Sequence, residues 1–171
     1  LLEKNEIGTG ASGCNFGCVQ LQDSNLGLSL ELNSRGFTRM PSMEQELDAD
    51  LEFRYIDSLL YAQNGEELAE LEKLQAEKQR TGLEVLLLGP EEVPRYEPHI
   101  DTSTLTGATQ FRQSNVNPFK YLFALAGNGR RHGLEILEHS EVREILVEGA
   151  ACTGVRTSDG DVVEADYVVL A

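Results

Sequence analysis

Hydrophobic residues recur with a helical period in three stretches of the chain. The first covers residues 26–47 and is interrupted at Pro41, which suits the first turn of a second helix. The second begins after Asn64, a favourable N-cap residue, and ends at Gly82. These patterns predict amphipathic helices that each bury one face.

The third helical stretch lies between Pro118 and Gly133. Proline is favoured at the first helical position because its fixed φ matches the helix and its missing N–H has no partner there anyway. Glycine is favoured just after the last turn. The predicted inner face of this helix consists of Phe119, Leu122, Phe123 and Ala126.

Alternating and continuous apolar runs predict β-strands. Residues 51–55 alternate and residues 59–62 are apolar, and with Asp57 and Ser58 as a turn between them they predict a hairpin. The last residues, 166–171, are apolar without alternation, which is typical of a strand covered on both faces in a parallel sheet. Other strands are expected at residues 85–88, 104–111, 134–138, 142–147, 152–157 and 162–165.

The first residues carry the most informative motif. Glu3 closes a short apolar stretch, and a loop rich in glycine and small residues follows at residues 7–17. A carboxylate at the end of a strand is what a dinucleotide site uses to hold a ribose. Glycines let the backbone approach a ligand and leave N–H groups free to bind it. The usual G-x-G-x-x-G turn would lie about 20 residues before such an acid, so we interpret the chain as an internal fragment.

Charge and length restrict the classes of protein. The 171 residues suit one domain or parts of two, and 40% of them are hydrophobic, enough for a core. The net charge of −15 argues against nucleic acid and anionic membranes as partners. The sequence has no apolar run long enough to predict a transmembrane segment.

The cysteines and histidines show no ligand spacing, so no metal site is expected. An odd, small number of cysteines favours reduced thiols and a cytoplasmic protein. Cys14 and Cys18 are interpreted as small passive residues, with covalent attachment of a cofactor or a redox role as the alternative.

Three pieces of the sequence, in this order, carry a family resemblance. They are the acid and glycine-rich loop at residues 3–17, the helix opened by Asn117-Pro118 and closed by Gly133, and the β-rich stretch 141–171. Together they resemble the FAD-dependent amino-acid and amine oxidoreductases of the glycine, sarcosine and D-amino-acid oxidase type. The resemblance implies FAD as the cofactor of the intact protein.

The resemblance also implies a cofactor site. Glu3 would hold the adenosine ribose, the glycine-rich loop would pass along the pyrophosphate toward the flavin, and Val142 would touch the adenine through its backbone. Family members often have arginine where this chain has Cys14. The expected cofactor-binding residues are Glu3, Lys4, Gly8, Gly10, Ala11, Ser12, Asn15, Gly17, Val142 and Ala171.

The fold implied is α/β, with an α+β middle part. Residues 1–47 and 116–171 would be parts of a Rossmann-like FAD-binding domain that flanks residues 48–115, part of a largely antiparallel substrate-domain sheet. In that middle part Arg54, Tyr55 or Tyr61 could face substrate, although a core or surface position suits each of them too.

The leading functional hypothesis is oxidation of a small amine or amino acid by hydride transfer to the flavin, with the imine product then hydrolysed. No general base is identified in this stretch, so the catalytic residues are unknown, and the isolated fragment is predicted to be inactive. Two alternatives stay open: a non-catalytic subunit or assembly module, and a hydroxy-acid or glycerol-phosphate dehydrogenase on the same scaffold. A homo- or hetero-oligomer is compatible with each.

Overall fold

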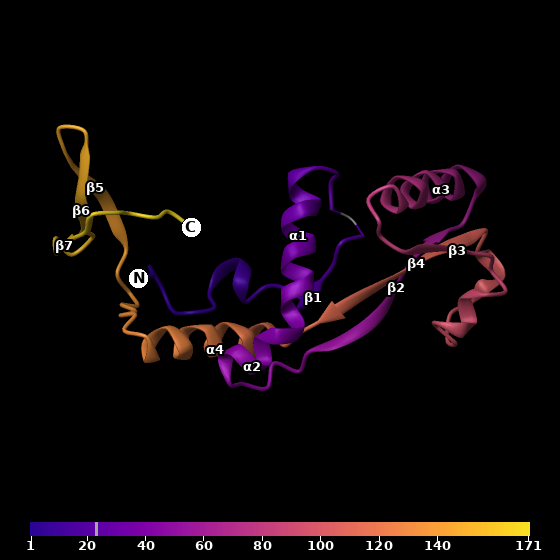
Figure 1. Ribbon diagram of the computed structural model, residues 1–171, viewed down its shortest axis with the longest axis horizontal. Coiled ribbons are helices and arrows are strands. Elements are labelled where there is room, and N and C mark those ends of the chain that lie inside the picture. Colours follow the sequence, from indigo (N-terminus) through magenta and orange to yellow (C-terminus); the bar gives the residue numbers. More distant parts are fainter. Residues whose placement is uncertain (23) are drawn as a thin grey trace. The chain divides into compact units, whose positions relative to one another are not determined.

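The computed structural model describes residues 1–22 and 24–171 (Figure 1). They divide into two compact units, each described by itself. Unit 1 comprises Leu1–Phe16, Leu47–Ala49 and Pro118–Ala171. Unit 2 comprises Gly17–Glu46 and Asp50–Asn117.

Unit 2 is built on an antiparallel sheet around one long strand. This strand, β4 (Gly107–Asn115), pairs along one edge with β2 (Arg54–Ala62) and along the other with β1 (Cys18–Val19) and β3 (Val85–Leu88). Figure 1 shows β2 and β4 as the two long arrows of this unit. The largely antiparallel sheet expected in the middle of the chain is therefore confirmed.

The hairpin expected between residues 51 and 62 is wrong. β2 is one continuous strand, paired with β4 from Arg54 opposite Asn115 to Ala62 opposite Gly107. Asp57 lies inside the strand, where its carboxylate accepts a hydrogen bond of 2.6 Å from the side chain of Gln110. A turn-forming residue can occupy a strand when a cross-strand partner satisfies its side chain.

Three α-helices are found among the described residues of unit 2. α1 (Leu28–Arg39) leads through a 3-10 turn, Met40–Ser42, into α2 (Met43–Leu47), which confirms the interruption predicted at Pro41. α3 (Gly65–Gln79) begins after Asn64, whose side chain accepts a hydrogen bond from Glu67 N as expected of an N-cap. Two buried clusters form the core: one contains Leu21, Leu30, Val85 and Phe111, and the other contains Leu88, Val93 and Ala108.

Unit 1 contains the fourth helix and a second sheet. α4 (Pro118–Arg131) begins at the predicted proline, and Gly133 after it has a φ of 88°. The sheet is an antiparallel meander of β5 (Val142–Glu148), β6 (Ala151–Thr157) and β7 (Val162–Glu164), close to the predicted ranges.

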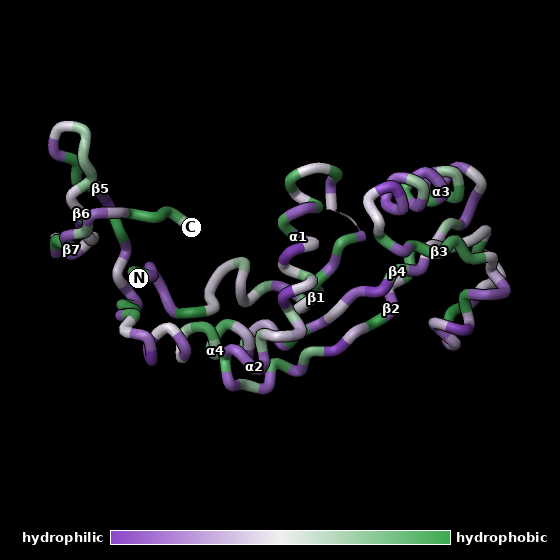
Figure 2. Tube along the Cα trace, in the orientation of Figure 1, coloured by the Kyte–Doolittle hydropathy of each residue, from purple (hydrophilic) through white to green (hydrophobic). Residues whose placement is uncertain are grey.

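Three expectations for unit 1 are wrong. Residues 134–138 form no strand beyond a parallel bridge between Leu2 and Leu137. Residues 166–171 form no strand either, because no described segment pairs with them; this stretch, mostly hydrophobic in Figure 2, leaves Val169 86% exposed. On α4, Phe119 and Phe123 are also exposed. Of the four residues expected on the inner face, Ala126 is buried and Leu122 is half-buried.

Within residues 1–22 and 24–171, no helix has both the length and the apolar character needed to cross a membrane.

Candidate functional site

Glu3 is held at a fixed place in unit 1 by its backbone. Its N–H donates to Leu137 O at 2.9 Å, and its own carbonyl accepts from Ser140 N at 2.7 Å. One carboxylate oxygen, Oε1, accepts from Asn5 N at 2.8 Å. The other, Oε2, has no partner among the described residues, so it is available to a hydroxyl group of a ligand.

The loop after Glu3 is shaped by its own hydrogen bonds and by one remote carboxylate. Glu138 Oε1 accepts from Ile7 N at 2.7 Å and so ties the beginning of the loop to the segment before β5. The loop then forms a short 3-10 helix, Gly10–Ser12. The side chain of Asn15 donates to Ser12 O at 2.7 Å and closes the turn.

Two glycines of this loop are required by its geometry. Gly8 has a φ of 95°, a conformation that side chains rarely adopt. At Gly13, an added Cβ would lie 2.0 Å from Gly8 O, so any larger residue would push the two parts of the loop apart. The glycine-rich composition therefore serves a tight backbone fold.

Three backbone N–H groups of this loop are left without an acceptor among the described residues: those of Gly8, Gly10 and Ala11. Clustered free N–H groups form an anion-binding concavity, because their partial positive charges add. Free N–H groups in a glycine-rich loop are the kind of donor that a dinucleotide site uses for its phosphate groups.

Two clefts of unit 1 meet at Glu3. The smaller, of about 250 Å³, is lined by Glu3, Gly8 and Ser12 on the loop side. The apolar wall opposite comes from α4 and the segment after it, through Leu122, Leu125, Ala126, Leu134 and Ile136. The larger cleft, of about 530 Å³, brings Glu3 together with Lys4, Val142 and Ala171.

Lys4 is already engaged in an ion pair. Its Nζ lies 3.1 Å from Glu141 Oε1, and the second oxygen of Glu141 lies 2.8 Å from Arg143. Lys4 is exposed and Glu141 is half-buried, so an anionic ligand near Lys4 would compete with a partly exposed ion pair.

The remaining predicted residues lie outside both clefts. Gly10, Ala11 and Asn15 are on the exposed rim of the loop. Gly17 belongs to unit 2, where it is buried, has a φ of 72° and accepts a hydrogen bond from Val116 N at 3.0 Å. The structure therefore brings Glu3, Lys4, Gly8, Ser12, Val142 and Ala171 to two adjoining clefts.

Sequence reasoning missed the residues that support this site. Glu138 holds the loop, and leucines of α4 form the cleft wall, yet both are more than 100 positions away from the loop in sequence. Nothing in the local pattern around residue 138 distinguishes a carboxylate that binds a distant N–H from a surface acid.

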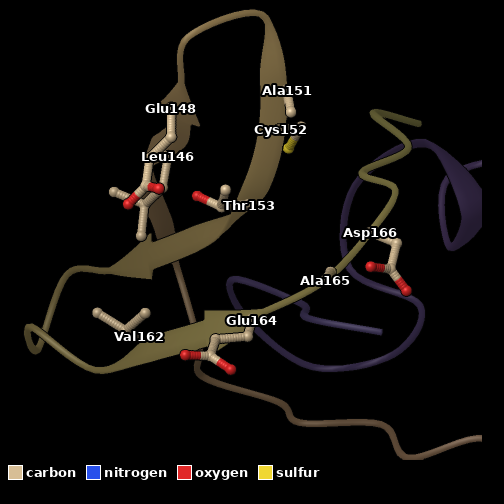
Figure 3. Close-up of a pocket in the computed structure, with 9 residues that line it drawn as sticks. All are labelled: Leu146, Glu148, Ala151, Cys152, Thr153, Val162, Glu164, Ala165 and Asp166. Atoms are coloured by element: carbon tan, nitrogen blue, oxygen red, sulfur yellow. The ribbon is translucent and has the colours of Figure 1, made fainter.

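A third cleft of unit 1, of about 760 Å³, lies along the β5–β7 sheet (Figure 3). It carries Glu148, Glu164 and Asp166, and Figure 3 shows their carboxylates well apart. Within the described part of the chain, no group of three acidic, histidine or cysteine side chains could hold a metal ion. This cleft therefore offers no assembled chemistry.

Comparison with known proteins gives consistent results. Residues 1–171 match the family model described as DAO, FAD dependent oxidoreductase. Subunit A1 of the anaerobic glycerol-3-phosphate dehydrogenase of Haloferax volcanii is 33% identical over 104 residues, which is 53% of this chain and 18% of that protein. The mitochondrial pyruvate dehydrogenase phosphatase regulatory subunit of Mus musculus is 23% identical over 172 residues, or 99% of this chain and 19% of that protein. The chain thus spans less than a fifth of the length of these curated relatives.

Solved structures share the fold. Glycine oxidase from Geobacillus kaustophilus superposes with a TM-score of 0.87 at 23% identity, over 96% of this chain and 46% of that one. L-proline dehydrogenase from P. horikoshii gives 0.84 at 23% identity, over 96% and 43%. L-α-glycerophosphate oxidase from Mycoplasma pneumoniae, solved with FAD bound, gives 0.80 at 21% identity, over 93% and 43%.

The chain belongs to the DAO family of FAD-dependent oxidoreductases.

Proposed function

We propose that the protein containing this chain oxidises a small amine or amino acid, with FAD as the hydride acceptor. The observation that carries the proposal is the cluster of free N–H groups beside the half-free carboxylate of Glu3 in a chain of this family. The similarity in fold to glycine oxidase and L-proline dehydrogenase supports an amine as the substrate. When bound, the flavin supplies the redox chemistry.

In this proposal the residues of unit 1 bind and orient the cofactor. Glu3 Oε2 would accept a hydrogen bond from a ribose hydroxyl. Gly8, Gly10, Ala11 and Ser12 would pass along the pyrophosphate, with free N–H groups of the first three as donors and Asn15 closing the loop. The role of Gly17, which belongs to unit 2, stays a prediction from the family resemblance. Lys4, Val142 and Ala171 would line the adenosine side.

We assign parts of the chain to domains on the same basis. Residues 1–47 and 116–171 would contribute to an FAD-binding domain, and residues 48–115 would contribute to a substrate domain. The antiparallel sheet around β4 supports the second assignment, because it carries the long strand pair of residues 48–115.

Two other functions have a specific observation in their favour. The relative from Haloferax volcanii is a subunit of a glycerol-3-phosphate dehydrogenase, which favours a hydroxyl-bearing phosphate ester as the substrate. The relative from Mus musculus is a regulatory subunit, which favours a non-catalytic role.

The proposal is tested by anaerobic reduction of the FAD-loaded protein with glycine, sarcosine, L-proline and D-alanine, and with glycerol 3-phosphate in parallel. Loss of the oxidised-flavin absorbance with one of the amines is the expected result. Reduction by glycerol 3-phosphate alone would transfer the assignment to the hydroxy substrate. A protein that binds FAD but is reduced by none of them would favour the regulatory role.

The cofactor site is tested separately by Glu3→Gln. Removing the charge weakens the hydrogen bond to a ribose hydroxyl, so the Kd for FAD is expected to rise by about tenfold. Glu6→Gln is the matched control, since Glu6 is exposed and pairs only distantly, at 3.9 Å, with His139. Equal FAD affinity of the Glu3 variant and the wild type would contradict the assignment.

A further inference from the structure

The chain contains two Asn-Gly pairs, Asn64-Gly65 and Asn128-Gly129, and the structure places them in different surroundings. An asparagine before a glycine is prone to cyclise, because a residue without a Cβ brings its backbone N–H to the side-chain amide with little hindrance. Asn64 is exposed and precedes α3, whereas Asn128 is half-buried within α4. The two pairs are identical as dipeptides, so a large difference in their reactivity has to come from the fold.

The backbone nitrogen of Gly65 is unrestrained. Gly65 is the first residue of α3, where a backbone N–H has no acceptor inside the helix. No other acceptor for it is found among the described residues. Gly65 is exposed, and a Cβ added to it would meet no atom within 4 Å. Its nitrogen therefore has no hydrogen bond to break before it attacks a neighbouring carbonyl carbon.

The side-chain amide of Asn64 is held as an electrophile. Its Oδ1 accepts a hydrogen bond from Glu67 N at 2.9 Å. Attack at Cγ places negative charge on this oxygen, and a backbone N–H already aimed at it stabilises that charge. The amide nitrogen, Nδ2, has no partner in the described part of the chain, so no hydrogen bond there retains it as a leaving group.

The second pair is restrained by the end of α4. The carbonyl oxygen of Asn128 accepts from His132 N at 3.2 Å, and that of Gly129 accepts from Leu134 N at 2.9 Å. Gly129 lies beyond the first turn of α4, where a backbone N–H donates to the carbonyl oxygen four residues earlier. The end of the helix must open before the nitrogen of Gly129 becomes a nucleophile.

We propose that Asn64 is a site of spontaneous modification, at which asparagine converts through a cyclic imide to aspartate and isoaspartate. Gly65 N forms a bond to Asn64 Cγ, the Cγ–Nδ2 bond breaks, and ammonia leaves with the proton of the Gly65 N–H. Water then opens the ring. Attack of water at Cγ gives aspartate, and attack at the main-chain carbonyl carbon of Asn64 gives isoaspartate. No oxidation or reduction takes place, and the inference is independent of the proposed amine oxidation.

The two products affect α3 differently. Aspartate keeps a side-chain oxygen for Glu67 N and is a favoured N-cap residue. Isoaspartate adds a methylene to the main chain before Gly65, and it turns the carbonyl that accepts from Leu68 N at 3.0 Å into part of a free carboxylate. Leu68 packs closely on β4, since its Cδ1 would lie 2.8 Å from a Cβ added to Gly107. Isoaspartate at position 64 is therefore expected to loosen the first turn of α3.

The experiment compares both asparagines in one sample. The FAD-loaded protein is incubated at mildly alkaline pH, and peptide mass spectrometry follows the conversion of amide to acid at each position. In the folded protein Asn64 is expected to convert about tenfold faster than Asn128, and in urea the two rates should become similar. Equal rates in the folded protein would overturn the assignment. A folded protein whose Asn64 stays intact while the urea-denatured chain converts would overturn it too.

Gly65→Ala is the matched variant for the chemistry. Gly65 has no positive φ and open space at its Cβ position, so alanine fits there. This variant should slow conversion at position 64 and leave position 128 unchanged. An unchanged rate at position 64 would argue against attack by the nitrogen of residue 65.

Asn64→Asp supplies one product directly and tests the effect on the helix. Hydrogen exchange of the Leu68 N–H in this variant should match that of the wild type. In the isoaspartate form, separated by chromatography, the same N–H is expected to exchange about tenfold faster. Equal exchange in the two forms would contradict the loosening of α3.

Discussion

At the scale of single residues, the largest departure from the sequence pattern is Lys78. Its position in the last turn of α3 predicts an exposed cation that complements the helix end. The structure buries it, with 2% of its surface exposed, and its ammonium group donates to Leu21 O at 3.2 Å and to Ser24 O. It thus ties α3 to the segment between β1 and α1.

Lys78→Met tests this tie. The substitution keeps the length of the side chain but leaves two buried carbonyl oxygens without that donor, so the free energy of unfolding is expected to fall by about 2 kcal/mol. Urea denaturation measures it. Lys73→Met on the same helix is the control: Lys73 is 65% exposed, and the change should be within about 0.5 kcal/mol. Equal stability of the two variants would refute the role of Lys78.

Asp101 supplies a prediction about pH. The Ser103 side chain and backbone N–H both donate to its carboxylate and hold the pKa of Asp101 below its ordinary value. A depressed folded-state pKa contributes stability above the unfolded pKa and loses it as pH falls through the folded value. Ser103→Ala is therefore expected to raise the pKa of Asp101, measured by NMR titration, whereas Ser158→Ala should leave it unchanged.

At the scale of secondary-structure elements, α3 shows how local sequence sets a helix end. Asn64 Oδ1 accepts from Glu67 N at 2.9 Å, and Glu67 Oε2 accepts in return from Gln63 N at 2.7 Å. This pair is similar to a capping box, except that Glu67 binds the N–H of Gln63, the residue before the N-cap, instead of the N–H of Asn64. It is readable from the sequence because its members are three or four residues apart.

Asn64→Ala is expected to lower the free energy of unfolding by about 1 kcal/mol, because the N–H of Glu67 loses its acceptor at the helix end. Glu72→Gln, at an exposed position of the same helix, is the comparison and should have little effect. A capping role would be excluded if the two substitutions changed the midpoint of urea unfolding equally.

Strands were harder to predict than helices. Residues 85–88 and the three strands of the β5–β7 sheet match the expected ranges closely, since each is bounded by turn residues. The sequence predicts two strands in place of β2 because Asp57-Ser58 has turn chemistry, and only the pairing of β2 with β4 reveals a single strand. The folded structure also explains why a glycine stands at position 129 inside α4. An added Cβ there would lie 2.7 Å from Leu134 Cδ2, a contact that the periodicity of the sequence does not reveal.

At the scale of the whole molecule, the cofactor site depends on more than the described loop. The G-x-G-x-x-G pattern of the 171 residues, Gly8–Gly13, follows Glu3 instead of preceding it by about 20 residues. The solved structures of similar fold are covered to 46% or less in the three comparisons described above. In the proposed site the chain would provide an acceptor for the ribose and donors for the phosphates, but no helix N-terminus aimed at them is among the residues assigned to the site.

We therefore predict that the isolated 171-residue chain binds no stoichiometric FAD and does not oxidise amines, because it lacks that part of the pyrophosphate site. The measurement is the flavin absorbance of the purified chain after incubation with FAD and gel filtration. The longer protein treated in the same way is the positive control. One FAD retained per isolated chain would refute the prediction.

The sequence by itself determined the family, the helices with their caps, the β5–β7 meander and the identity of the acid and the glycine-rich loop. These features depend on residues close together in the chain, so their spacing carries the information. Tertiary structure alone decided the single strand β2, the burial of Lys78, the support of the loop by Glu138 and the placing of Arg112 against Tyr55 instead of Asp57. In each case the partner is distant in sequence, or several residues of the same chemical type could have served as the partner. Packing in three dimensions decides which residue makes the contact.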